Sequence, residues 1–183
     1  MRIITVVVTV FMLAGCAGQH PRNKQLYTAH NIWNHRGQLY CINYKVGDRI
    51  LPAGTAVKHV KVRTKDNLRL ITFQVAQTDA KYSIAFNPRW HPGETAKSYK
   101  KKLFTRKPFD QLARKLTPEE IESIKRGVVT SGMSKRAVLI SYGPPPEHRT
   151  RSLDSDQWIY WQDRFRTKRI CFDGNQRTVH CDE

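Results

Sequence analysis

The N-terminal segment determines which part of this chain can fold. Met1 and Arg2 make a short positively charged start, and a mostly apolar run follows from Ile3 to Ala14. An apolar run of this length is typical of the hydrophobic region of a secretory signal. It is too short for a membrane-spanning helix, which needs roughly 20 apolar residues. We therefore predict that residues 1–15 are a cleaved signal peptide and take no part in the fold.

The segment ends in Leu13-Ala14-Gly15-Cys16, which resembles the lipobox of bacterial lipoproteins. The resemblance implies that Cys16 accepts the lipid, and that more than one acyl chain, such as palmitate, anchors the protein stably. By the sorting rule of such proteins, Ala17 implies the outer membrane, with the folded part facing the periplasm. Residues 16–24 are expected to form a flexible lipidated tether. The alternative is an ordinary signal peptide with a chance cysteine at its end.

Positive charge dominates the composition. The chain has 32 Lys and Arg against 15 Asp and Glu, a formal net charge of +17, and a pI near 10.1. Such a balance favours acidic partners such as lipopolysaccharide, anionic lipid or nucleic acid, although solubility alone would also account for it. The charge is densest within residues 96–116, which we predict to be a solvated basic connector. Candidate residues for binding an acidic polymer are Lys100, Lys101, Lys102, Arg106 and Lys107.

Three cysteines follow Cys16, namely Cys41, Cys171 and Cys181. Disulfides persist in the oxidising periplasm, and three thiols allow one bridge and one free cysteine. Cys171 and Cys181 are not symmetric about the turn at Gly174, so a bridge between them requires the tail to bend back. A bridge from either of them to Cys41 is an equal alternative. No pair has the spacing of a zinc site, and we expect neither a metal nor a cofactor.

Residues 25–95 have the pattern of a β-rich domain. Residues 68–75 alternate in polarity, which places Ile71 and Phe73 on one face of a strand. Several short strands at spacings of roughly ten residues favour a small β-sheet or open barrel. The turn and strand at residues 51–57 resemble those of small SH3-like barrels. We therefore expect an α+β chain whose N-terminal domain is a small β-sheet or SH3-like barrel.

Two helices are predicted next. Thr117 and Glu120 have the spacing of a capping box at the start of the first helix, which should end at Gly127. Ser134 has the position of an N-cap for the second helix. That helix should end at Gly143, because three prolines follow the glycine.

Three antiparallel strands complete the predicted order of the C-terminal module, which we place at residues 117–183. The strands are expected at residues 157–162, 164–172 and 176–181. The last two are joined by a hairpin turn at Asp173-Gly174. The predicted order is therefore helix, helix and three strands.

This module resembles the SmpA/OmlA family of outer-membrane lipoproteins, which includes BamE. The similar segments are Gly132-Met133-Ser134-Lys135-Arg136-Ala137-Val138, Tyr142-Gly143-Pro144-Pro145, Trp158-Ile159-Tyr160-Trp161 and Ile170-Cys171-Phe172-Asp173-Gly174-Asn175. The resemblance implies a helix pair packed on a small antiparallel sheet, as in β-lactamase inhibitor proteins, and a part in outer-membrane assembly. Family members are shorter and have no counterpart of residues 25–95.

The strand at residues 157–162 carries aromatic side chains on both faces. Trp158 and Tyr160 point one way, whereas Ile159 and Trp161 point the other way. Helices can cover only one face of a small sheet, so the other face must meet the N-terminal domain or a partner. Because Trp and Tyr are frequent interface hot spots, Trp158, Tyr160 and Trp161 are candidate partner-binding residues. Burial inside the protein is the alternative.

No catalytic arrangement is recognisable. A hydrolytic pair of His91 with Glu94 has no nearby nucleophile in a strained turn, and His30, His35 and His59 have no metal-site spacing. We therefore expect a non-catalytic lipoprotein that docks a periplasmic or outer-membrane protein and supports outer-membrane assembly or envelope integrity. No small-molecule substrate is expected. The alternative function is binding of an acidic envelope polymer.

Overall fold

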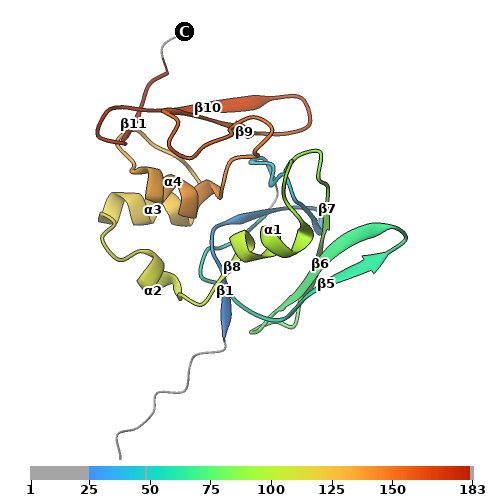
Figure 1. Cartoon of the computed structure of the whole chain (residues 1–183). Coiled ribbons are helices and arrows are strands. Elements are labelled where there is room, and N and C mark those ends of the chain that lie inside the picture. The colour runs from blue at the N-terminus through green and yellow to red at the C-terminus, as the bar shows by residue number, and fades with distance from the viewer. Residues whose placement is uncertain (1–24, 48, 182–183) are drawn as a thin grey trace, which may run out of the picture.

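The computed structural model describes residues 25–47 and 49–181, and the predicted signal peptide, Cys16 and the tether lie outside this range. The described part contains two sheets and four helices (Figure 1). The strands of the larger sheet are β1 (Leu26–Thr28), β2 (Ile32–His35), β3 (Gln38–Tyr40), β4 (Arg49–Leu51), β5 (Ala56–Lys65), β6 (Leu68–Val75), β7 (Lys81–Phe86) and β8 (Phe104–Thr105). The smaller sheet contains β9 (Gln157–Trp161), β10 (Thr167–Phe172) and β11 (Thr178–Val179). The helices are α1 (Ala96–Leu103), α2 (Phe109–Leu112), α3 (Pro118–Arg126) and α4 (Lys135–Tyr142).

The larger sheet is curled, with strand order β4-β2-β3-β7-β6-β5-β1-β8. Its neighbouring strands are antiparallel except for the parallel pair β3 and β7. The α+β class and the β-rich character of residues 25–95 are thus confirmed. The sheet is larger than expected, because β8, from the predicted connector, joins its edge beside β1.

The first core forms between this sheet and α1. The alternation expected in residues 68–75 is confirmed, since Ile71, Phe73 and Val75 are buried on β6. Ile84 is fully buried beside Ile71 on β7, as the cross-strand register requires. We call the side of the sheet that carries these residues its inner face. Burial of such side chains is the main favourable contribution to folding.

The predicted solvated connector is instead a structural element over much of its length. Ala96, Tyr99 and Leu103 recur at helical spacing, and all three are buried against the inner face of the sheet. Thr95 caps the helix, and its side chain accepts a hydrogen bond from the backbone N–H of Ser98 at 3.1 Å. Lysines flank this apolar stripe, and their high charge led the sequence analysis to predict a solvated segment instead of a packed helix.

The helix pair of the second half begins and ends where the sequence predicted. Thr117 Oγ1 accepts from the backbone N–H of Glu120 at 3.3 Å, and the Glu120 carboxylate accepts from the backbone N–H of Thr117 at 3.0 Å. The helix ends at Gly127, whose φ of 66° is the left-handed conformation that glycine adopts without strain. Ser134 caps α4, which ends at Gly143. The observed order is helix, helix and three antiparallel strands.

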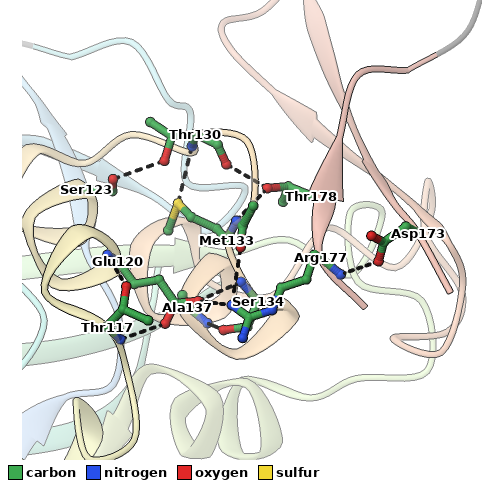
Figure 2. A network of polar contacts seen from close by, with 11 residues as sticks. Thr117, Glu120, Ser123, Thr130, Met133, Ser134, Ala137, Asp173, Arg177 and Thr178 are labelled. Carbon is green, nitrogen blue, oxygen red and sulfur yellow. Dashed lines mark hydrogen bonds and ion pairs between the residues drawn. The ribbon is translucent and has the colours of Figure 1, made fainter. Parts of the chain in front are cut away.

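A buried carboxylate ties the two helices to β11 (Figure 2). Glu120 Oε1 accepts from the backbone N–H of Ser134 at 2.7 Å and from Arg177 Nη1 at 2.9 Å. Burial alone would raise the pKa of Glu120, but hydrogen bonds from Ser134 and the charge of Arg177 outweigh it and hold the pKa below its usual value. In the same network the Thr178 hydroxyl accepts from the backbone N–H of Met133 at 2.8 Å. The starts of both helices are therefore fixed to the last strand.

The two halves of the chain pack against each other. Trp33 on β2 belongs to the second core, where its ring meets Tyr142 edge-on at 5.5 Å. Asn31 Nδ2 donates to the backbone oxygen of Ile124 at 2.7 Å. Asn43 Nδ2 donates to the backbone oxygen of Tyr142 at 3.3 Å. The domains predicted at residues 25–95 and 117–183 thus share buried contacts rather than being separated by a solvated linker.

The structure selects one of the open cysteine pairings. Cys171 and Cys181 form a disulfide with 5.3 Å between their Cα atoms. Cys171 faces Val179 across β10 and β11, so the chain bends back after β11 to bring Cys181 to it. Cys41 is free and buried, and burial raises the pKa of its thiol.

Candidate functional site

The outer face of β5, β6 and β7 is the side opposite to α1. Residues that face each other across neighbouring strands lie on the same side of a sheet. Lys61 therefore lies beside Thr72, and Thr72 beside Ser83, in one row across the three strands. In the next row Gln74 lies beside Lys81. Polar and cationic side chains thus cover this part of the outer face.

Cations outnumber carboxylates on and beside this face. The members of what we call the cationic face are Lys58, Lys61, Arg63, Lys65 and Lys81. None of the three strands contains Asp or Glu. Within the described part of the chain, Lys58 is the member that forms an ion pair, at 2.6 Å with Asp79 in the turn before β7. Uncompensated positive charges raise the local potential and attract anions.

A β-bulge accounts for how Lys58 and Lys61 share one face. They are three positions apart in the chain, so regular alternation would place them on opposite sides of β5. The register shifts between these two residues, and His59 has a φ of 55°. The extra residue restores the alternation, which keeps Val57 and Val62 on the inner side and turns Lys61 outward. The irregular spacing of the valines was the sequence signal for this bulge.

A hollow of about 490 Å³ lies on the cationic face. Its polar lining consists of His59, Lys61, Arg63, Thr72, Gln74, Lys81 and Ser83. These side chains supply ammonium, guanidinium, hydroxyl and amide groups, which are the donors that bind phosphate and carboxylate oxygens. The hollow has no carboxylate among its lining residues. It is therefore suited to anions.

A second and larger hollow, of about 1180 Å³, continues from the first, and Ser83 lines both. Its large apolar and aromatic lining residues are Leu39, Tyr40, Ile42, Tyr44, Val62, Leu68, Leu70, Phe86 and Trp90. Arg69, Lys97 and Glu94 supply its charged groups. We call it the apolar hollow. Its volume is slightly above the roughly 300–1,000 Å³ of typical binding sites for small organic ligands.

Two of the predicted partner-binding residues lie in the second core. Trp158 is 0% exposed and Tyr160 is 1% exposed. The Tyr160 hydroxyl donates to the backbone oxygen of Gly143 at 2.9 Å, and the Trp158 ring meets Phe172 at 4.6 Å. Neither side chain is open to a partner in this structure, because the helix pair covers this face of the small sheet. The alternative of burial inside the protein describes them correctly.

Trp161 lies on the other face of the strand and is half-buried. Its indole N–H donates to His148 Nε2 at 3.1 Å, and the Trp90 ring lies 6.2 Å away. The loop after α4 and the loop before α1 thus cover much of the side chain. Trp161 helps to join the two halves of the protein.

The predicted polyanion-binding residues are not brought together with the cationic face. Lys100, Lys101 and Lys102 belong to α1, which packs on the inner face of the sheet. Lys102 is neutralised by ion pairs with Glu94 and, at 2.5 Å, with Glu147. The last two predicted residues, Arg106 and Lys107, are exposed after β8.

His91 and Glu94, the pair considered for hydrolysis, each contact other groups. His91 is buried, and its Nε2 lies 3.1 Å from the backbone oxygen of Cys41. Burial lowers the pKa of His91, and the carboxylate of Glu94 is bound by Lys102 and Ser98. Across residues 25–47 and 49–181, no group of three or more His, Cys, Asp and Glu side chains is placed to hold a metal ion.

Lys45 is a partly buried cation that the sequence did not reveal. Its amino group lies 4.5 Å from the ring centroid of Trp33 and 5.3 Å from that of Tyr160, and it donates to the backbone oxygen of Tyr142 at 2.5 Å. Burial lowers the pKa of this group well below its usual value. The rings provide favourable cation–π contacts. Lys45 therefore fixes the loop after β3 to the second core.

No family model, curated protein or solved structure matches this chain. None of the helices in the part that the structure describes is long and apolar enough to span a membrane.

Proposed function

We propose that this protein is a non-catalytic, outer-membrane-anchored periplasmic lipoprotein that binds an acidic envelope polymer through the cationic face. The observation that carries the proposal is the set of five Lys and Arg side chains on strands that contain no Asp or Glu. Their charges act together because they lie on one rigid sheet. Phosphate groups spaced along a polymer can engage several of them at once, which raises the overall affinity.

The proposed lipid on Cys16 would support this function. An anchored protein stays close to the membrane surface, where the phosphates of anionic lipids are concentrated. The attraction between clustered cations and an anionic surface acts over about a Debye length, which is roughly 8 Å at physiological salt. The anchor would therefore bring the cationic face within range of its polymer.

The test measures binding of the chain from Ala17 onward, which lacks the predicted signal and the lipidated Cys16, to the delipidated and phosphorylated core oligosaccharide of lipopolysaccharide. The variant Lys61→Gln/Arg63→Gln/Lys81→Gln should weaken binding at least tenfold. It should also lower the slope of log Kd against log salt by about two to three, because roughly one counterion is released per phosphate contact.

The matched control is Lys100→Gln/Lys101→Gln/Lys107→Gln, which removes the same charge from α1 and the segment after β8. Binding within twofold of the wild type is expected for this control. Equal losses in both triple variants would mean that net charge alone attracts the polymer, and the proposed site would be wrong.

Protein docking is the second candidate function, supported by the resemblance of residues 117–183 to the SmpA/OmlA family. Since Trp158 and Tyr160 are buried, a docking surface would lie elsewhere on this module. Phe165 is 90% exposed at the turn between β9 and β10 and lies between Arg164 and Arg166. Crosslinking in intact envelopes should then recover a partner with the wild type and lose it with Phe165→Ser. A partner recovered equally well by both chains would exclude this turn.

A further inference from the structure

The apolar hollow exposes apolar side chains to solvent. Leu68 is 53% exposed, and Leu70 and Tyr40 are half-buried beside it. An exposed apolar patch inside a hollow marks a binding site more often than scattered apolar residues do. Its volume of about 1180 Å³ is sufficient for one or more acyl chains.

The apolar hollow and the cationic face form one continuous surface. Tyr40, Ala85, Leu70 and Arg63 face one another in a single row across β3, β7, β6 and β5. The row passes from an aromatic ring at one end to a guanidinium at the other. A ligand on this surface would therefore meet apolar groups first and cations next to them.

The charges around the apolar hollow also favour an anion. Arg69 and Lys97 line it, and neither forms an ion pair within the described residues. Its carboxylate, Glu94, is held by Lys102. Burial alone would raise the pKa of Glu94, but the hydrogen bond and charge of Lys102 outweigh it, so the net shift is downward.

We infer that the apolar hollow binds an acyl chain of an anionic lipid whose phosphate group lies on the cationic face. The inference rests on the proposed function and narrows its ligand from an acidic polymer to a phosphorylated amphiphile. Leu68, Leu70, Tyr40 and Tyr44 would contact the chain. Arg63 and Lys61 would donate to the phosphate oxygens, as charge-assisted hydrogen bonds of this type are strong.

The test compares inorganic phosphate with octyl, decyl and dodecyl phosphate, each below its micelle concentration, on the chain from Ala17 onward, which lacks the predicted signal and Cys16. Burial of each further methylene should lower the Kd by about fourfold until the hollow is filled. Lys61→Gln/Arg63→Gln should weaken all three alkyl phosphates. Leu68→Ser/Leu70→Ser should flatten the dependence on chain length while leaving the binding of inorganic phosphate unchanged.

Controls separate folding from binding. Leu68→Ser alone changes a side chain that is already half exposed, so it keeps the test valid if the double variant fails to fold. Leu153→Ser changes a Leu that is 45% exposed and is not among the lining residues of the hollow, and it should behave as the wild type.

Each result has a definite meaning. Equal affinities for all chain lengths, with retained binding of the delipidated oligosaccharide, would overturn the acyl-chain site and leave the proposed function standing. A dependence on chain length that survives both the Leu68→Ser and the double substitution would place the chain elsewhere and would also overturn it. Absence of binding to both the oligosaccharide and the alkyl phosphates would refute both proposals.

Discussion

Trp158 and Phe165 belong to the same hairpin but lie in opposite environments. Trp158 is fully buried between the small sheet and the helices, whereas Phe165 is 90% exposed at the turn. Both are aromatic, and the sequence marked Trp158, but not Phe165, as a candidate partner-binding residue. The environment of each ring, rather than its chemical type, decides whether it stabilises the fold.

We therefore predict opposite effects of truncating the two rings. Trp158→Ala should reduce the free energy of unfolding by about 3–5 kcal/mol, because it removes a large buried side chain and leaves a cavity. Phe165→Ala should change it by less than about 0.5 kcal/mol. Urea unfolding followed by circular dichroism measures both. A small loss in Trp158→Ala would contradict the buried position.

His30 makes stability depend on pH. Burial lowers its pKa from 6.5 to about 4. The unfolded chain therefore takes up a proton as the pH falls through 6.5, whereas the folded chain does so only near pH 4. Its contribution to stability is thus fully present above pH 6.5 and is lost as the pH falls toward 4.

Between pH 7 and pH 4.5, this group should account for a loss of about 2–3 kcal/mol in the free energy of unfolding. His30→Gln should remove that part of the pH dependence. His59→Gln, at an exposed histidine, serves as the control and should follow the wild type. Parallel pH profiles for the wild type and His30→Gln in urea unfolding would show that His30 is not the group responsible.

At the scale of elements, α1 departs most from expectation. The sequence interpretation weighed its lysines and missed the stripe of Ala96, Tyr99 and Leu103 beneath them. By contrast, α3 and α4 were predicted correctly, because their caps use local signals that need no knowledge of the rest of the chain. Local signals therefore determine where helices start and end, whereas the surroundings determine whether a basic segment is packed.

A substitution in α1 distinguishes a packed helix from a linker. Leu103 is 1% exposed in the first core. Leu103→Ala should lower the free energy of unfolding by about 2–5 kcal/mol. Lys101→Ala, at an exposed position of the same helix, should change it by less than about 0.5 kcal/mol. If Leu103→Ala lowers the free energy of unfolding no more than Lys101→Ala does, residues 96–116 would be a solvated linker and not a packed element.

At the scale of the whole molecule, buried polar groups join the two halves. Asn31 is 1% exposed; its Nδ2 donates to the backbone oxygen of Ile124, and its Oδ1 accepts from the backbone N–H of Ala53 at 2.8 Å. Trp33 adds an apolar contact across the same boundary. Such contacts couple the unfolding of the two cores.

We predict a single unfolding transition, with tryptophan fluorescence and circular dichroism coinciding. Asn31→Ala should lower the free energy of unfolding by about 1–3 kcal/mol, because it removes two buried hydrogen bonds and leaves the backbone N–H of Ala53 without its partner. In this variant the unfolding transitions measured by fluorescence and by circular dichroism should shift by the same amount. Two separated transitions in the wild type would instead favour independent domains.

The proposed membrane anchor concerns the whole molecule as well. Metabolic labelling with palmitate should mark the wild type and leave Cys16→Ala unmarked. The variant should also lose its association with the outer-membrane fraction. Equal labelling of the two chains would rule out Cys16 as the lipidated residue.

The sequence by itself determined the α+β class, the strand alternation at Ile71 and Phe73, and the ends of α3 and α4. Each of these depends on residues close together in the chain. Only the tertiary structure decided that Cys171 pairs with Cys181, that Trp158 is buried, and that α1 completes the first core. These outcomes depend on which distant segments meet.

The cationic face also depends partly on the sequence and partly on the tertiary structure. Its lysines and arginines are visible in the sequence, but their common side depends on the bulge at His59 and on the pairing of β5, β6 and β7. A bulge of one residue reverses which side every later residue faces. The N-terminal signal and Cys16 are sequence features alone. The surface that the anchor would present to the envelope is determined by strand pairing, because a sheet brings together charges that lie far apart in the chain.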